Sequence, residues 1–363
     1  MKGHHFGLLV VAAVLAILAA LWTTSIREPV ISGESAGEFL LPGLADNLNN
    51  VTGVKLTGPG AEIIATLTRG EISWVLAEKS GYRANMGELR ELLVKLSEAT
   101  LLEEKTSNPE FYERLGVENI EASDAGGVLV ELEGVDVPAV IVGDQEGSRQ
   151  ATYVRLIAET TSWLASGDIN VANDTMRWLD RQAIDINASR IAEIEITHAD
   201  GHTLRVSKSE FGQPNFDVAN IPAGRELERD NIANAIGSVL KGLRVDDVAP
   251  LSDSGFAGLS TTRAAFRAFD GLVINVDVAA KDDKYYAYFH AATDAAIATR
   301  YLPAGASEDE EEGPPPQPQA DLTAIAAEAD ELNGKFSDWV YELPELKYDQ
   351  LSRRLDDLLK DQS

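Results

Sequence analysis

The residues that come closest to a metal site are His198-Ala199-Asp200-Gly201-His202, which bring two imidazoles and a carboxylate together within five positions. Imidazole and carboxylate groups are ligands of zinc and of other transition metals. An Asp-Gly pair between apolar residues, here Ile194 and Leu204, is also typical of a hairpin turn. The turn is the favoured interpretation, because Gly58-Pro59-Gly60 takes the same place in a related earlier segment without any histidine. We therefore predict no metal site.

Other residue types capable of chemistry do not combine into a recognisable site. The aromatic run Tyr285-Tyr286-Ala287-Tyr288-Phe289 would suit sugar stacking, but a core strand is the favoured explanation because strands are rich in aromatic residues. With 59 acidic residues, a glycosidase-like carboxylate pair cannot be selected by spacing. The chain has no Walker phosphate loop and no His-Glu-x-x-His helix. The sequence predicts a non-enzymatic protein without catalytic, cofactor-binding or metal-ligating residues, and without a cofactor.

Two tryptophan-bearing segments indicate an internal duplication. Residues 163–180 match residues 339–356 without a gap, and Trp163 meets Trp339. Two copies are too few for a solenoid, so the match predicts tandem domains. Trp163, Trp178 and Trp339 are interpreted as core anchors at the ends of the two units. The first α+β repeat is expected to extend over residues 51–188 and the second over residues 189–363.

The first copy begins with strand-like runs at residues 51–56, 63–67 and 74–76, which predict an antiparallel meander. A helix should follow and cover this sheet, because four leucines recur at helical spacing on one face. These are Leu89, Leu92, Leu93 and Leu96.

A short helix with explicit boundary signals comes next. Asn108 is a suitable N-cap, Pro109 fits the first helical position, and Gly116 is a typical stop. A second group of strands is predicted at residues 128–132, 139–142 and 152–156.

The second copy repeats this order. Residues 191–196 and 216–218 match strands of the first meander, and residues 264–269, 273–278 and 286–288 match the later strands. The helix is expected to bury the side chains that align with the four leucines, namely Ile232, Ala235, Ile236 and Val239.

The second copy differs from the first by an insertion between His290 and Ser337. Within it, the acidic run from Glu308 to Glu312 adjoins a proline-rich run. Like charges next to prolines cannot bury a core, so a disordered insert is predicted at about residues 303–320.

The N-terminal residues predict a membrane anchor. Phe6 to Trp22 is a run of 17 uncharged, mostly apolar residues. As a helix it would be about 25 Å long, near the lower limit for crossing a bilayer. A cleaved signal peptide, the alternative, usually has a shorter apolar run of about 7–15 residues. Lys2 before the run favours a cytoplasmic N-terminus. We expect a cytoplasmic tip (1–5), a transmembrane anchor (6–24) and a stalk (25–50), with the remainder extracytoplasmic, in the periplasm.

The composition restricts the classes of partner. The net charge of −28 disfavours nucleic acid and anionic bilayer surfaces, because both require positive charge facing phosphate. A charged partner is therefore expected to be cationic. The absence of cysteine excludes disulfides and thiolate chemistry.

Four segments are distinctive when taken together: the N-terminal anchor, Lys105-Thr106-Ser107-Asn108-Pro109-Glu110 leading to Leu115-Gly116, Tyr153-Val154, and Trp178-Leu179-Asp180-Arg181. In these segments the chain resembles one bacterial family, the domain of unknown function 4340 (DUF4340). The second copy departs from it by lacking the Asn-Pro helix. The resemblance implies a membrane-anchored extracytoplasmic protein, often encoded beside ABC-transporter components of the gliding-motility type. The family has no established catalytic residues, so none is carried over.

Two classes of function remain open. The first is a non-enzymatic, membrane-anchored accessory or scaffold protein of the bacterial inner membrane, associated with an ABC transporter or an envelope assembly. The second is an extracytoplasmic binding protein that captures a small ligand or polymer between its two repeats, where pockets are common.

Overall fold

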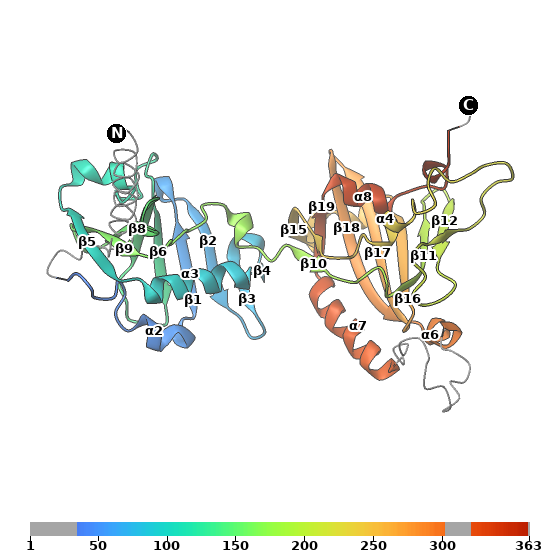
Figure 1. Ribbon diagram of the computed structural model, residues 1–363, viewed down its shortest axis with the longest axis horizontal. Coiled ribbons are helices and arrows are strands. Elements are labelled where there is room, and N and C mark those ends of the chain that lie inside the picture. Colours follow the sequence, from blue (N-terminus) through green and yellow to red (C-terminus); the bar gives the residue numbers. More distant parts are fainter. Residues whose placement is uncertain (1–34, 302–320, 362–363) are drawn as a thin grey trace, which may run out of the picture. The chain divides into compact units, whose positions relative to one another are not determined.

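The computed structural model describes residues 35–301 and 321–361 and divides the chain into two units, Met1–Leu179 and Asp180–Ser363 (Figure 1). Residues 180–188, which the sequence assigns to the first copy, thus belong to the second unit. The expected cytoplasmic tip, anchor and acidic insert lie outside the described residues. Among the residues that are described, no helix is long and apolar enough to cross a membrane.

The first unit is built on one antiparallel sheet of nine strands, ordered β4-β3-β2-β1-β6-β7-β8-β9-β5. In this sheet Leu56 of β1 lies opposite Val130 of β6 and Ala65 of β2, and all three are buried. The predicted meander is confirmed as β1 to β3. The strands are β1 (Gly53–Thr57), β2 (Ile63–Arg69), β3 (Trp74–Leu76), β4 (Tyr82–Arg83), β5 (Leu101–Thr106), β6 (Val128–Glu133), β7 (Val140–Glu146), β8 (Ala151–Leu156) and β9 (Ser162–Ser166).

Helix α3 (Met86–Glu98) lies across the strands of this sheet (Figure 1). The Asn85 side chain caps it by accepting from two backbone N–H groups of the first turn. Of the four predicted leucines, Leu93 is only half-buried and the other three are buried. The short helix α2 (Leu44–Asn47) packs against α3, and Leu40, Leu41 and Leu44 are buried. The folded unit therefore begins before residue 51, within the expected stalk.

The second unit has a sheet of eight strands, ordered β13-β12-β11-β16-β17-β18-β19-β15, which repeats the strand order of the first sheet without a counterpart of β4. These strands are β11 (Ile191–Thr197), β12 (Thr203–Ser207), β13 (Asp217–Val218), β15 (Asp247–Pro250), β16 (Thr262–Ala268), β17 (Leu272–Lys281), β18 (Lys284–Thr293) and β19 (Trp339–Leu343). A separate pair joins β10 (Gln182–Ile184) to β14 (Leu243–Arg244). The expected α+β class with antiparallel sheets is confirmed.

The helix aligned with α3 is much shorter than predicted. Helix α4 covers only Asn234–Gly237, and Ala235 is exposed, whereas Ile236 is buried. Glycine is a poor helix former. A Cβ atom at Gly237 would lie 2.2 Å from the Phe216 ring, so glycine lets this ring pack closely onto the backbone of α4.

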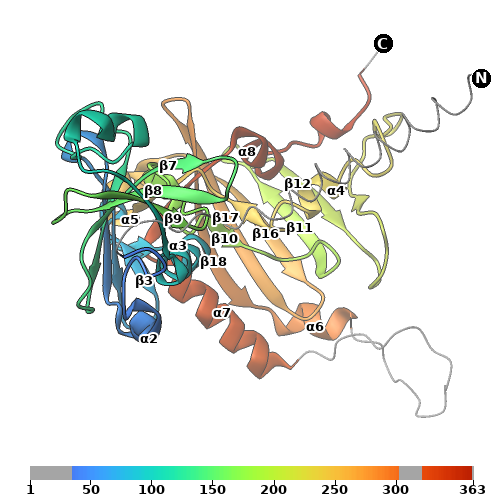
Figure 2. The ribbon, with the colours of Figure 1, turned by 60° about the vertical axis from the view of Figure 1, so that its left-hand side comes forward.

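The insertion contains two helices, α6 (Ala295–Tyr301) and α7 (Leu322–Phe336). Figure 2 shows α7 beside β18, where the Asn333 side chain bonds both backbone groups of Ala291. The Phe336 ring packs 5.3 Å from that of Phe289. The sequence did not predict α7.

The C-terminal segments of the two units align with an offset that differs from the one in the ungapped match of residues 163–180 with residues 339–356. Leu179 forms an isolated bridge with Ala84, and Leu359 forms the equivalent bridge with Leu227. Leu179 thus corresponds to Leu359 rather than to Leu355. The helix α8 (Glu345–Leu351), which follows β19, accommodates the additional residues.

Candidate functional site

The predicted histidine turn joins β11 to β12. The His198 N–H donates to the His202 carbonyl oxygen at 2.9 Å, and the Asp200 carboxylate accepts from Arg354 at 2.7 Å. This arginine holds the pKa of Asp200 well below its usual value. Burial is the main cause that lowers the pKa of His198, which is 6% exposed. Within the described ranges, no group of three or more His, Asp or Glu side chains could hold a metal.

The aromatic strand residues have structural neighbours. Phe289 is buried, and Tyr285 stacks on Tyr348 with ring centroids 4.6 Å apart. Of the three proposed anchors, Trp163 and Trp178 are buried and Trp339 is half-buried.

The pattern Gly-x-Ser-x-Gly occurs once, at residues 33–37. In a nucleophile elbow this pattern links a strand to a helix. Ser35 and Gly37 instead lie in turns before β1, and the Gly37 N–H donates to the Leu101 carbonyl oxygen at 2.7 Å. The pattern therefore lacks the structural context of a hydrolase nucleophile.

The segment that carries the family resemblance forms the 3₁₀ helix η4 (Pro109–Leu115). Its predicted boundaries are confirmed: the Asn108 side chain accepts from the Glu110 N–H, and Gly116 ends the helix with φ 63°. This helix buries only a small part of its surface against the sheet. Tyr112 is its buried residue, and it packs with Val117 and Ile141 on the sheet.

Glycines allow the end of η4 to approach the sheet very closely. A Cβ atom at Gly143 would lie 2.3 Å from the Leu115 carbonyl oxygen, and one at Gly127 would lie 2.3 Å from that of Gly116. Both contacts are with backbone atoms, which cannot rotate away. We call Gly116, Gly127 and Gly143 the glycine junction.

A cavity of about 680 Å³, which we call the Arg155 pocket, lies beside η4. Arg155 of β8 is 4% exposed and lines it. Its guanidinium donates to the carbonyl oxygens of Val117 (2.8 Å) and Glu159 (3.1 Å) and to Asn119 Oδ1 (2.7 Å). It also lies 4.8 Å from the centre of the Tyr112 ring, a cation–π contact. The pocket therefore contains a buried positive charge held by neutral acceptors.

Acidic side chains line the same pocket. Glu118 is half-buried, and its Oε1 accepts from the Gly126 N–H at 2.9 Å. Its Oε2 is buried without a hydrogen-bond partner. Glu121 and Glu159 lie on the exposed rim. The pocket thus offers both signs of charge.

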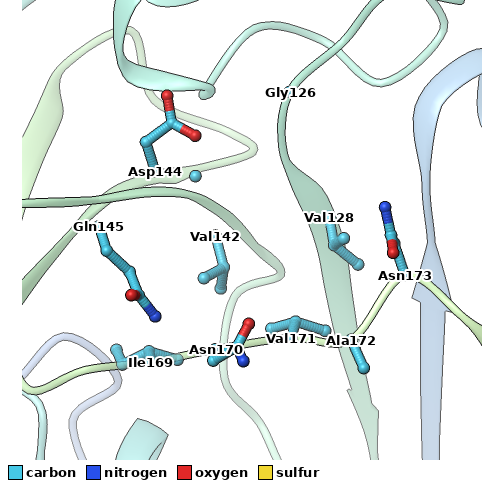
Figure 3. Close-up of a pocket in the computed structure, with 11 residues that line it drawn as sticks. Gly126, Val128, Val142, Asp144, Gln145, Ile169, Asn170, Val171, Ala172 and Asn173 are labelled. Atoms are coloured by element: carbon cyan, nitrogen blue, oxygen red, sulfur yellow. The ribbon is translucent and has the colours of Figure 1, made fainter. Parts of the chain in front are cut away.

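A second cavity, of about 510 Å³, lies between the sheet and residues 169–173 (Figure 3). A bulge between Val142 and Gln145 shifts the register of β7 against β8. As a result Gln145 points toward the 169–173 segment, as Val142 does, while Asp144 points away (Figure 3). The polar side chains that line this cavity are the amides of Gln145, Asn170 and Asn173 and the carboxylate of Asp144.

The side chains of the Arg155 pocket include a guanidinium, carboxylates, an amide and a phenol, all of which can hold a ligand through hydrogen bonds or ion pairs. Sequence reasoning missed this site, although Arg155 within the otherwise uncharged run Ala151–Leu156 was a signal: a charge on a core strand is rare unless it is partnered.

These observations define a two-unit α+β protein built on antiparallel sheets. The chain belongs to the DUF4340 family, a domain of unknown function, whose model matches residues 74–261, about half of the chain. The matched region includes η4, the glycine junction and the whole Arg155 pocket. No curated protein and no solved structure matches the chain.

Proposed function

We propose that this chain is a non-enzymatic accessory or scaffold protein of the bacterial inner membrane. Residues 6–24 would anchor it, and its folded units, which we infer to be tandem copies, would act outside the cytoplasm on an ABC transporter or an envelope assembly. The shared strand order supports the duplication.

The observation that carries the docking role is the exposure of two apolar residues, one that lines the Arg155 pocket and one on η4. Ile157, which lines the pocket, is 42% exposed. Phe111 of η4, next to the lining residue Tyr112, is 43% exposed. Partially exposed aromatic and aliphatic residues next to well-packed backbone are typical anchors of protein interfaces. The acidic rim of Glu121 and Glu159 would favour a partner with basic residues around its contact surface.

The test is co-purification from gently solubilised membranes. A Phe111→Asp/Ile157→Asp variant should lose a stoichiometric partner that the unaltered chain retains. Ile72→Asp is the matched control, because Ile72 is fully exposed between β2 and β3. Equal partner recovery from both variants would refute docking at this surface, provided that their thermal unfolding matches that of the unaltered chain.

Small-ligand capture is a second candidate function, favoured by the Arg155 pocket. The sequence suggested capture between the repeats, whereas this pocket is formed entirely by residues of the first unit. A protein that purifies alone and carries a bound small molecule would favour capture over scaffolding.

A further inference from the structure

We propose that the Arg155 pocket binds a small zwitterion of the amino acid or short peptide class. Arg155 would hold its carboxylate and Glu118 its ammonium group. This inference rests on the capture function and specifies the ligand chemistry of that site.

The first argument is the unmet hydrogen-bonding capacity of Arg155. A guanidinium carries five N–H donors. Within the part of the chain that the structure describes, three of these N–H groups donate to protein acceptors, which leaves two without a protein acceptor. In the described part of the chain no carboxylate forms an ion pair with Arg155. A buried charge without a counter-charge is costly, and a ligand carboxylate would supply the missing partner in the bidentate geometry that arginine favours.

The second argument is the unmet capacity of Glu118. Its Oε2 is buried and has no partner, although a carboxylate oxygen accepts strongly. Arg155 lines the same pocket, yet within the described residues the two side chains form no salt bridge with each other. Two opposite charges in one cavity that do not meet leave space for a molecule carrying the complementary pair. Solvent does not reach Oε2 in this conformation, so the Glu118 carboxylate would turn toward the cavity to accept from a ligand ammonium while the ligand carboxylate accepts from Arg155.

The size and walls of the pocket fit this class of ligand. A volume of about 680 Å³ lies within the usual range of small-molecule sites, roughly 300–1,000 Å³. Pro109, Tyr112 and Ile157 supply apolar and aromatic surface between the polar groups. Such surface would accept the carbon backbone or a side chain of an amino acid or dipeptide.

In the second unit, an apolar cluster packs where short helices follow the corresponding strand. The helices α5 (Leu251–Ser254) and η6 (Phe256–Gly258) follow β15 as η4 follows β5. Phe256 packs there with Ala279 and Val340, and tyrosines of β18 cover them. An apolar filling is thus available to the fold. A buried arginine is generally no more stabilising than such a filling, which points to a role other than stability for Arg155.

The experiment measures binding to the full-length chain by calorimetry. The probes are glycine, γ-aminobutyrate, L-alanyl-L-alanine and trialanine, which separate the two charges by increasing distances. For the zwitterion that binds best, the N-acetyl derivative lacks the ammonium and the amide derivative lacks the carboxylate. Each derivative should bind at least about tenfold more weakly, since a hydrogen bond to a charged group is worth that much.

Glu118→Gln is the decisive variant, because its amide oxygen can still accept from the Gly126 N–H. It should weaken binding of the zwitterion by about tenfold and leave binding of the N-acetyl derivative unchanged. Glu121→Gln removes an equal charge from the exposed rim and should change either affinity by less than about threefold. Thermal unfolding of both variants should match that of the unaltered chain.

The outcomes separate the two hypotheses. If the derivatives bind as tightly as the zwitterion, capture stands and the zwitterion chemistry is wrong. If Glu118→Gln weakens all probes equally, Glu118 does not hold the ammonium and the assignment is overturned. If none of the zwitterions or derivatives binds, capture of this ligand class by the Arg155 pocket is refuted as well.

Discussion

The glycine junction permits a sharp test of how η4 is held on the sheet. Gly143→Ala would place a Cβ atom 2.3 Å from the Leu115 carbonyl oxygen and 2.6 Å from that of Gly116. Both atoms belong to the backbone, so relief requires η4 to move away from β7. Overpacking of this kind costs about 1–3 kcal/mol. For a domain of this size that corresponds to a fall in Tm of roughly 2–12 °C, at about 2–4 °C per kcal/mol.

The assay has to resolve one unit, because two units need not unfold in a single transition. Hydrogen exchange should therefore accelerate in η4 and in the neighbouring strands of the first unit, while the backbone amides of the second unit remain protected. Gly147→Ala is the matched control, since a Cβ atom there meets nothing within 4 Å. Equal melting temperatures and equal exchange in the two variants would refute the close-approach argument for Gly143.

Two further predictions concern the second unit. Ile236→Asp should destabilise the second unit by several kcal/mol, because Ile236 is only 1% exposed. Ala235→Asp, on the exposed side of α4, should have nearly no effect on stability. Equal effects of the two substitutions in thermal unfolding would show that the register of α4 is wrong. Because burial lowers the pKa of His198, the unfolded chain binds a proton more readily, and the second unit should lose stability as pH falls through about 6.5, the ordinary histidine value. His198→Gln should flatten this pH dependence in denaturant unfolding, and an unchanged slope would contradict the assignment.

Local patterns predicted much of the first unit. Alternating apolar residues located β1 and β2, leucine spacing located α3, and Asn108 with Gly116 bounded η4, because each signal lies within a few neighbouring residues. The helix α7 was missed because its buried positions are sparse: Ile325, Ala329 and Phe336. The Arg155 pocket was missed for another reason. Its lining comes from residues 109–122 and 155–160, which meet only after η4 has packed on β8.

The strong negative charge of the chain bears on which ligands can reach Arg155, whose buried guanidinium forms no ion pair with an acid among the described residues. With a net charge of −28, the surface repels free anions at long range, and the acids lining the Arg155 pocket add to that repulsion at short range. Arg155 is nevertheless buried and directs its donors to neutral groups, so its attraction is felt only inside the cavity. A ligand that carries equal and opposite charges experiences little net repulsion on approach and still offers a carboxylate at close range. The overall charge thus disfavours the binding of simple anions such as phosphate at this site. The exposed acids alone would favour simple cations. Only a molecule that carries both charges satisfies Arg155 and Glu118 together.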